Sequence, residues 1–134
     1  MKYFLDTNMI IYAVKGAYPS IMKHIASMPT ENIVIPSMVL AEIEYGARKS
    51  KDYNKTISKY KAFTSNFMTI SFKEPSDFHY GIIRSSLEKA GETIGYNDYI
   101  IAATVLANDG ILVTHNTKEF LRIPGLNVED WTEE

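Results

Sequence analysis

The amino-acid sequence predicts an α/β protein in which a parallel sheet carries helices on both faces. Short apolar runs alternate with longer segments of helical periodicity, a pattern typical of parallel sheets. Residues 98–108 are apolar on nearly every side, as expected of a central, buried helix. With 134 residues the chain has the length of one ordinary domain, so we expect residues 1–134 to form a single domain.

The first predicted elements are one strand and two helices. Residues 2–6 are a short apolar run, which predicts a buried strand. The helix predicted at residues 9–15 ends at Gly16, because glycine readily adopts the conformation that follows a helix C-terminus. Residues 19–28 predict a second short helix.

The next elements are a strand and two longer helices. Residues 32–36 are β-branched and end in proline, which predicts a strand that stops there. Ser37 offers an N-cap for an amphipathic helix over residues 39–50. Residues 51–68 predict a longer polar helix with aromatic and aliphatic side chains at helical spacing.

The following segment leads to the buried helix. Residues 69–72 predict a strand, and residues 75–90 predict a helix that Gly91 closes. Asn97 is expected to cap the helix at residues 98–108.

The last segment contains two further strands. Gly110 is expected to end the buried helix, and residues 111–114 then predict a strand. A short helix at residues 117–121 and a last strand at residues 126–128 complete the expected order.

The composition excludes several classes of function. The chain has no cysteine, which excludes thiolate zinc sites, thiol nucleophiles and disulfide frameworks. No apolar run reaches the roughly 18 residues of a membrane span, and the acid Asp6 within the first apolar run argues against a signal peptide. We therefore expect a cytoplasmic protein without a membrane segment. Its net charge of −2 does not favour nucleic-acid binding, so that case depends on the site.

Two aspartates stand where strands and helices meet. Asp6 follows the first strand directly, and ligands of parallel sheets bind at the carboxyl ends of strands. Asp98 opens the buried helix, whose N-terminus we expect to point toward the same edge. Each has a simpler interpretation, because Asp6 can cap the next helix and Asp98 gains from the helix dipole.

Two glutamates add to this set. Glu42 lies in an amphipathic helix between apolar neighbours, where a carboxylate is costly unless it is paired or bound to a cation. Glu119 follows the strand at residues 111–114 and lies near Asn116. A solvated boundary position explains Glu42 alone, and a first-turn helix acid explains Glu119 alone.

Taken together, these acids predict a metal site. Several carboxylates that converge on one crevice repel each other, and a hard divalent cation resolves that repulsion. Oxygen ligands favour Mg²⁺, with Mn²⁺ as a possible substitute, and such sites are well suited to phosphodiester hydrolysis. The proposed ligands, direct or through water, are Asp6, Glu42 and Asp98, and Glu119 completes the catalytic acids. The residues expected to orient water or phosphate are Thr7, Asn8, Thr114 and Asn116.

Four segments carry a family resemblance that extends along nearly the whole chain. They are FLDTN at residues 4–8, AEIEYGARKS at 41–50, IGYNDYIIAA at 94–103 and VTHNTKEFLRIPGLNVEDW at 113–131. With these motifs the chain resembles the VapC toxins, which are PIN-domain proteins. The resemblance implies a three-layer α/β/α sandwich and a Mg²⁺- or Mn²⁺-dependent endoribonuclease that cuts structured RNA such as tRNA. It also implies a cognate VapB-like antitoxin.

The resemblance assigns Asp6, Glu42 and Asp98 to the invariant acids of the family. Many PIN domains have an aspartate where this chain has Asn116, so either Asn116 or Glu119 completes the site. Two alternatives stay open: a PIN-type nuclease that acts on DNA, and a PIN-like module that binds RNA or protein without catalysis. A phosphoacceptor domain that uses Asp6 is a distant further alternative.

Two surface features suggest partners. Residues 48–61 are rich in lysine, which fits contacts to RNA phosphates as well as an ordinary solvated helix face. The helices at 19–28 and 51–68 carry more apolar side chains than one face needs, which suggests an antitoxin groove or a homodimer. These apolar residues are Ile21, Met22, Ile25, Met28, Ile57, Phe63 and Phe67.

Overall fold

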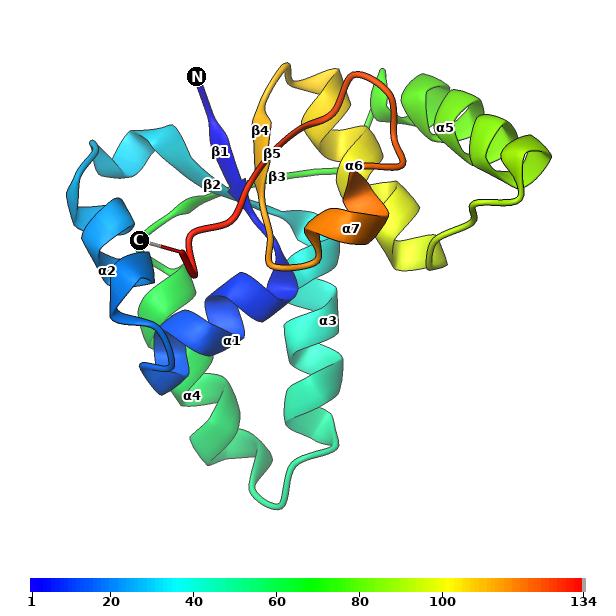
Figure 1. Cartoon of the computed structure of the whole chain (residues 1–134). Coiled ribbons are helices and arrows are strands. Elements are labelled where there is room, and N and C mark those ends of the chain that lie inside the picture. The colour runs from blue at the N-terminus through cyan, green and yellow to red at the C-terminus, as the bar shows by residue number, and fades with distance from the viewer. Residues whose placement is uncertain (134) are drawn as a thin grey trace.

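The computed structural model describes residues 1–133 and contains a five-stranded parallel sheet between helices (Figure 1). The strands lie in the order β3-β2-β1-β4-β5, and all four pairings are parallel. The strands are β1 (Tyr3–Leu5), β2 (Ile33–Pro36), β3 (Met68–Ile70), β4 (Ile111–Val113) and β5 (Asn127–Glu129). The predicted α/β fold with a central parallel sheet is confirmed.

Seven α-helices connect the strands within the described residues 1–133. They are α1 (Thr7–Lys15), α2 (Pro19–Ala26), α3 (Ser37–Arg48), α4 (Tyr53–Thr64), α5 (Ser76–Ala90), α6 (Tyr96–Ala107) and α7 (Thr117–Phe120). A short 3₁₀ helix, Thr30–Asn32, precedes β2. Figure 1 shows α1, α2 and α4 gathered on one side of the sheet and α5 and α6 on the other. None of these helices is both long and apolar enough to cross a bilayer.

The helix α6 lies at the centre of the core, as its sequence predicts. It contacts β2 and β4 on the sheet and α5 on its outer side. Its side chains from Ile101 to Val105 are buried, including the hydroxyl-bearing Thr104. A helix that is apolar all round therefore has neighbours on several sides, which accounts for its composition.

Two predicted glycine stops are confirmed. Gly16 and Gly91 follow α1 and α5 with φ values of 67° and 68°, in the left-handed conformation that glycine adopts most easily. Gly110 has a different role, because α6 already ends at Ala107. A Cβ at Gly110 would lie 2.4 Å from Cε1 of the buried Phe4, so glycine is needed for close packing against β1.

Two predicted helix caps are wrong. Ser37 is the first residue of α3, and its hydroxyl instead accepts a hydrogen bond from the backbone N–H of Phe72 at 3.2 Å. The helix α6 starts two residues earlier than predicted, with Gly95 as N-cap, so Asn97 lies inside its first turn. Both side chains have found partners from distant segments, which local sequence does not reveal.

The predicted helix over residues 51–68 is too long. Asp52 caps α4 by accepting a hydrogen bond from the N–H of Lys55 at 3.1 Å, and the helix ends at Thr64. Met68 already belongs to β3, an edge strand whose Met68 and Thr69 are exposed. Because β3 is exposed, its sequence lacks the apolar run that would distinguish a strand from the end of a polar helix.

Apolar residues of α2 and α4 serve mainly the core. Ile21 and Ile57 are buried, and four more of the seven residues pack against the core: Ile25, Met28, Phe63 and Phe67. Only Met22 of that set is among the exposed large apolar residues. Core packing therefore uses most of the predicted apolar surplus, and the antitoxin groove or homodimer at this helix pair stays a prediction.

Candidate active site

Asp6 stands at the carboxyl end of β1, where it is 5% exposed. Its Oδ1 accepts a hydrogen bond from the backbone N–H of Thr7 at 2.8 Å, and its Oδ2 accepts one from the hydroxyl of Thr114 at 2.7 Å. Burial raises the pKa of Asp6, these two hydrogen bonds oppose that shift, and the nearby Glu42 adds to it. Asp6 is thus both the N-cap of α1 and part of a group of acids.

Glu42 on α3 is held by polar side chains from two other helices. The hydroxyl of Thr7 donates to Oε1 of Glu42 at 2.6 Å, and the side-chain amide of Asn97 donates to Oε2 at 3.4 Å. These contacts join α1, α3 and α6 at one point. Glu42 therefore has a fixed position, and it is not simply a boundary residue whose carboxylate reaches into water.

Asp98, in the first turn of α6, carries the strongest electrostatic sign of a shared site. Burial raises its pKa most, and Asp6, Glu42 and Glu119 raise it further in that order, to about 7 in all. The four predicted acids therefore lie close enough to act on one another. No hydrogen bond from residues 1–133 lowers this pKa. The ionised form of Asp98 is thus disfavoured by its surroundings within residues 1–133.

The remaining predicted residues lie around this group. Glu119 is on α7, and Asn116 is the N-cap residue of that helix, although its side chain makes no capping hydrogen bond. The backbone N–H of Asn116 donates to the hydroxyl of Thr114 at 3.0 Å. Asn8 is exposed on α1. The hydroxyls of Thr7 and Thr114 donate to the acids themselves, so in this arrangement they orient carboxylates.

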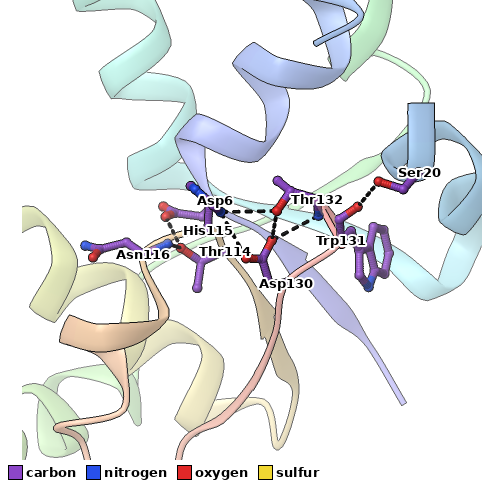
Figure 2. Close-up of polar contacts among 8 residues, drawn as sticks. All are labelled: Asp6, Ser20, Thr114, His115, Asn116, Asp130, Trp131 and Thr132. Atoms are coloured by element: carbon purple, nitrogen blue, oxygen red, sulfur yellow. Dashed lines mark hydrogen bonds and ion pairs between the residues drawn. The ribbon is translucent and has the colours of Figure 1, made fainter. Parts of the chain in front are cut away.

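A C-terminal segment supports the loop after β4 (Figure 2). Nδ1 of His115 lies 2.9 Å from Oδ2 of Asp130 and 3.2 Å from the hydroxyl of Thr132. Partial burial raises the pKa of Asp130, but hydrogen bonds from Thr132 and the contact with His115 hold it below its ordinary value. The backbone N–H of Thr114 also donates to the carbonyl of Glu129 at 2.9 Å. Residues 129–132 thus fix the loop that positions Asp6.

Trp131 anchors this C-terminal segment to the fold. Its side chain is 1% exposed, stacks on His24 with ring centroids 5.0 Å apart, and donates from Nε1 to Glu129 at 3.0 Å. Its carbonyl accepts a hydrogen bond from the hydroxyl of Ser20 on α2 at 2.8 Å, as Figure 2 shows. A continuous set of contacts therefore runs from α2 to the acids.

The sequence did not reveal two of these supporting features. Asn97 was expected to be a helix cap, and the hydrogen bond that it donates to Glu42 joins residues 55 positions apart. His115 is exposed in the loop after β4, and it contacts Asp130, which lies 15 positions further along the chain. In the sequence, these roles were indicated only by position, because Asn97 and His115 are each adjacent to a predicted site residue.

The donor chemistry of the site fits a hard divalent cation. All four acids offer oxygen, and a cation would favour the ionised form of Asp98, which burial and the other three acids disfavour. Among residues 1–133, no three or more His, Cys, Asp or Glu side chains are already arranged to hold a metal ion. Mg²⁺ in proteins is usually held by one or two carboxylates and keeps several waters, so the acids fit it without forming a closed cage.

Comparison with known proteins identifies the family. Residues 3–126 match the PIN domain family. The chain is 42% identical over 132 residues to Ribonuclease VapC2 of Rickettsia felis, an alignment that covers 98% of each chain. The chain belongs to the VapC ribonucleases of the PIN-domain family. The predicted ribonuclease toxin of a VapBC-type system is therefore confirmed.

Two further relatives agree with this assignment. The tRNA(fMet)-specific endonuclease VapC of Salmonella typhimurium is 32% identical over 131 residues, which is 98% of each chain. The crystal structure of VapBC2 from Rickettsia felis bound to a promoter DNA fragment contains a chain with a TM-score of 0.89 and 41% identity. That match covers 98% of this chain and 99% of the other. The VapC fold thus extends over nearly the whole chain.

Proposed function

We propose that this VapC ribonuclease cuts RNA at the acidic site and depends on Mg²⁺, with Mn²⁺ as a substitute. The observation that carries the proposal is the pKa of Asp98, raised to about 7 by burial and by Asp6, Glu42 and Glu119. Folding brings four carboxylates together at a cost in free energy, and no residue in the described part of the chain supplies a cation beside Asp98. A bound cation would recover that cost.

Each acid has a defined task in this proposal. Asp6, Glu42 and Asp98 would hold the metal directly or through water, and Glu119 or Asn116 would complete the site. When bound, the metal would activate water and stabilise charge on the phosphate. Thr114 and Thr7 would keep Asp6 and Glu42 in fixed orientations through their hydrogen bonds. Their hydroxyl oxygens, together with Asn8 and Asn116, are candidates to orient water or phosphate.

The proposed substrate is a structured RNA such as tRNA. The relative from Salmonella typhimurium is named as a tRNA(fMet)-specific endonuclease, and it aligns over 98% of both chains. We extend the substrate class, and not the individual tRNA, to this protein. The two alternatives to this proposal are a nuclease that cuts DNA and a module that binds RNA or protein without catalysis.

The proposed partner is a cognate VapB-like antitoxin that inhibits cleavage. The Rickettsia felis structure is described as VapBC2 bound to DNA, which is a complex of a VapC relative. We propose a corresponding complex here, formed in the cytoplasm by a homodimer of this chain that folds as one domain over residues 1–134. Sedimentation of the purified chain at several concentrations tests the homodimer, and a constant monomer mass would refute it.

The decisive experiment is cleavage of total cellular RNA by purified, folded, antitoxin-free protein in Mg²⁺, Mn²⁺ or EDTA. We expect discrete fragments with either metal, none in EDTA, and none from Asp6→Ala or Asp98→Ala. Sequencing of the fragment ends identifies the RNA. Cleavage that persists in EDTA or in both variants would refute the proposed site.

A matched DNA of the same sequence as the identified RNA serves as the second substrate. Preferential cleavage of DNA would favour the DNA nuclease instead. Tight RNA binding without cleavage under any metal would favour the non-catalytic module.

A further inference from the structure

Two exposed tyrosines flank the acidic site, one on each of two helices that supply its acids. Tyr45 follows Glu42 on α3, and Tyr96 precedes Asp98 on α6. Each tyrosine side chain is 66% exposed. Exposed aromatic rings are enriched at recognition surfaces, because they offer a large apolar face at a small cost in side-chain entropy.

Each tyrosine lines a hollow beside Glu42. One hollow of about 360 Å³ is lined by Thr7, Met38, Ala41, Glu42, Tyr45 and Asn97. The other, also of about 360 Å³, is lined by Glu42, Gly95, Tyr96, Asn97 and Asp98. The two hollows share Glu42 and Asn97, whose side chains meet at 3.4 Å. They are therefore neighbours, and Glu42 lies between the hollow lined by Tyr45 and the hollow lined by Tyr96 and Asp98.

A cation lies over each of these rings. Nζ of Lys49 is 5.0 Å from the ring centroid of Tyr45, and Cζ of Arg84 is 4.6 Å from that of Tyr96. These cation–π contacts restrict the rings and place positive charge beside hollows whose own charged groups are acidic. A ligand that suits this arrangement has flat faces that stack on the rings and negative charge that Lys49 attracts, together with Arg84, which also pairs with Glu88 at 3.3 Å.

We propose that Tyr45 and Tyr96 are stacking platforms for two nucleobases of an unpaired RNA segment, one on each side of the phosphate that is cut. Every base has a π-face, so stacking on tyrosine holds a strand without reading its sequence. Bases become free to stack on protein side chains in loops and other single-stranded segments. The inference rests on the proposed ribonuclease function and adds two side chains that hold the bases on either side of the cleaved phosphate.

Binding of a short oligoribonucleotide tests the platforms directly. The probe is single-stranded, carries 5′ fluorescein and one 2-aminopurine, and is mixed with the protein in EDTA. Tyr45→Leu and Tyr96→Leu remove a ring, whereas Tyr45→Phe and Tyr96→Phe keep it. Phe78→Leu is the matched control, because Phe78 is a 64% exposed aromatic on α5 that lines neither hollow.

We expect each leucine variant to weaken binding on the order of tenfold and to relieve 2-aminopurine quenching, since ring stacking contributes on that scale. The phenylalanine variants and Phe78→Leu should bind like the unmodified chain. Unchanged affinity in both leucine variants would overturn the proposal and leave the rings for another occupant, such as a segment of a protein partner. Equal loss in the leucine and phenylalanine variants would also overturn it, because the hydroxyl would then be responsible.

A second measurement separates this inference from the proposed function. In Mg²⁺ the leucine variants should raise KM for an RNA substrate with a smaller effect on kcat. Metal-dependent cleavage with an unchanged KM would refute the platforms and leave the ribonuclease site intact. Ring-dependent binding without any cleavage would refute the proposed active site and leave the platforms standing. If binding in EDTA is too weak to measure, the KM comparison decides.

Discussion

The carboxyl end of β1 and the first turn of α6 each place an aspartate in the same site, but they treat its charge differently. Asp6 is 5% exposed, yet it accepts hydrogen bonds from Thr114 and from the backbone of Thr7. Asp98 is less buried, and burial and three neighbouring acids raise its pKa to about 7 without an opposing hydrogen bond from residues 1–133.

This difference gives the two aspartates different tasks: Asp6 is held in a fixed orientation, whereas Asp98 is free to bind a cation. Hydrogen bonds to Asp6 use both of its oxygens and fix its orientation before any ligand arrives. No hydrogen bond from residues 1–133 lowers the pKa of Asp98. A bound cation would stabilise its ionised carboxylate, which burial and the neighbouring acids disfavour. A site built in this way combines one rigid carboxylate with one that favours a cation.

The largest expected effect is on catalysis, where the two aspartates should behave alike. Asp6→Asn and Asp98→Asn should each lower kcat/KM by on the order of 10²–10³-fold or more, since each removes charge that acts on the transition state. Initial rates of RNA cleavage in Mg²⁺ measure this. Asp109→Asn, an exposed acid just after the other end of α6, is the matched control and should keep full activity. Full activity in Asp98→Asn would remove it from the metal ligands.

The next effect tests the support of Asp6. Thr114→Val removes a hydrogen bond to a buried carboxylate and should lower the free energy of unfolding at pH 7 by about 1–3 kcal/mol. Thr104→Val is the control, because Thr104 is equally buried but donates to the backbone carbonyl of Ile100 at 2.8 Å. Urea denaturation of both variants measures the difference. Equal losses would show that Asp6 does not depend on Thr114.

Asp98 should make the metal-free protein less stable as the pH rises. Its pKa is about 3.8 when unperturbed and about 7 in the folded chain, so the folded state binds more protons between these values. The stability due to protonated Asp98 is therefore complete below about pH 4 and is lost by about pH 7. After allowance for solvent screening, Asp98→Asn should gain about 1–2 kcal/mol relative to the unmodified chain across that range. Urea denaturation in EDTA at several pH values measures it, and a constant difference would contradict this account.

The smallest expected effect is stabilisation by metal. At ten times the dissociation constant, Mg²⁺ should raise the free energy of unfolding by about 1.4 kcal/mol. Asp98→Asn should lose most of this gain, and Asp109→Asn should keep it. Thermal unfolding with Mg²⁺ or EDTA measures the shift. An equal gain in Asp98→Asn would mean that the ion binds elsewhere.

Much of the fold was predictable because its signs are local. Short apolar runs marked most of the strands, glycine marked the ends of α1 and α5, and an apolar composition marked α6 as central. The acids were also predictable, because parallel strands deliver their carboxyl ends to one edge. The edge strand β3 was placed less well, since its exposed residues resemble those of a polar helix.

The sequence alone determined which acids this protein has, the order of its strands and helices along the chain, and the family motifs that contain Asp6, Glu42 and Asp98. Only the tertiary structure decided how those acids are held. The contacts of Thr114 with Asp6 and of Asn97 with Glu42 span 108 and 55 positions. The contact between Asp130 and His115 also depends on the tertiary structure, in which the neighbouring Trp131 is buried and bonded to α2. The physical reason is that local periodicity sets backbone conformation, whereas partners so distant along the chain meet only when the core packs.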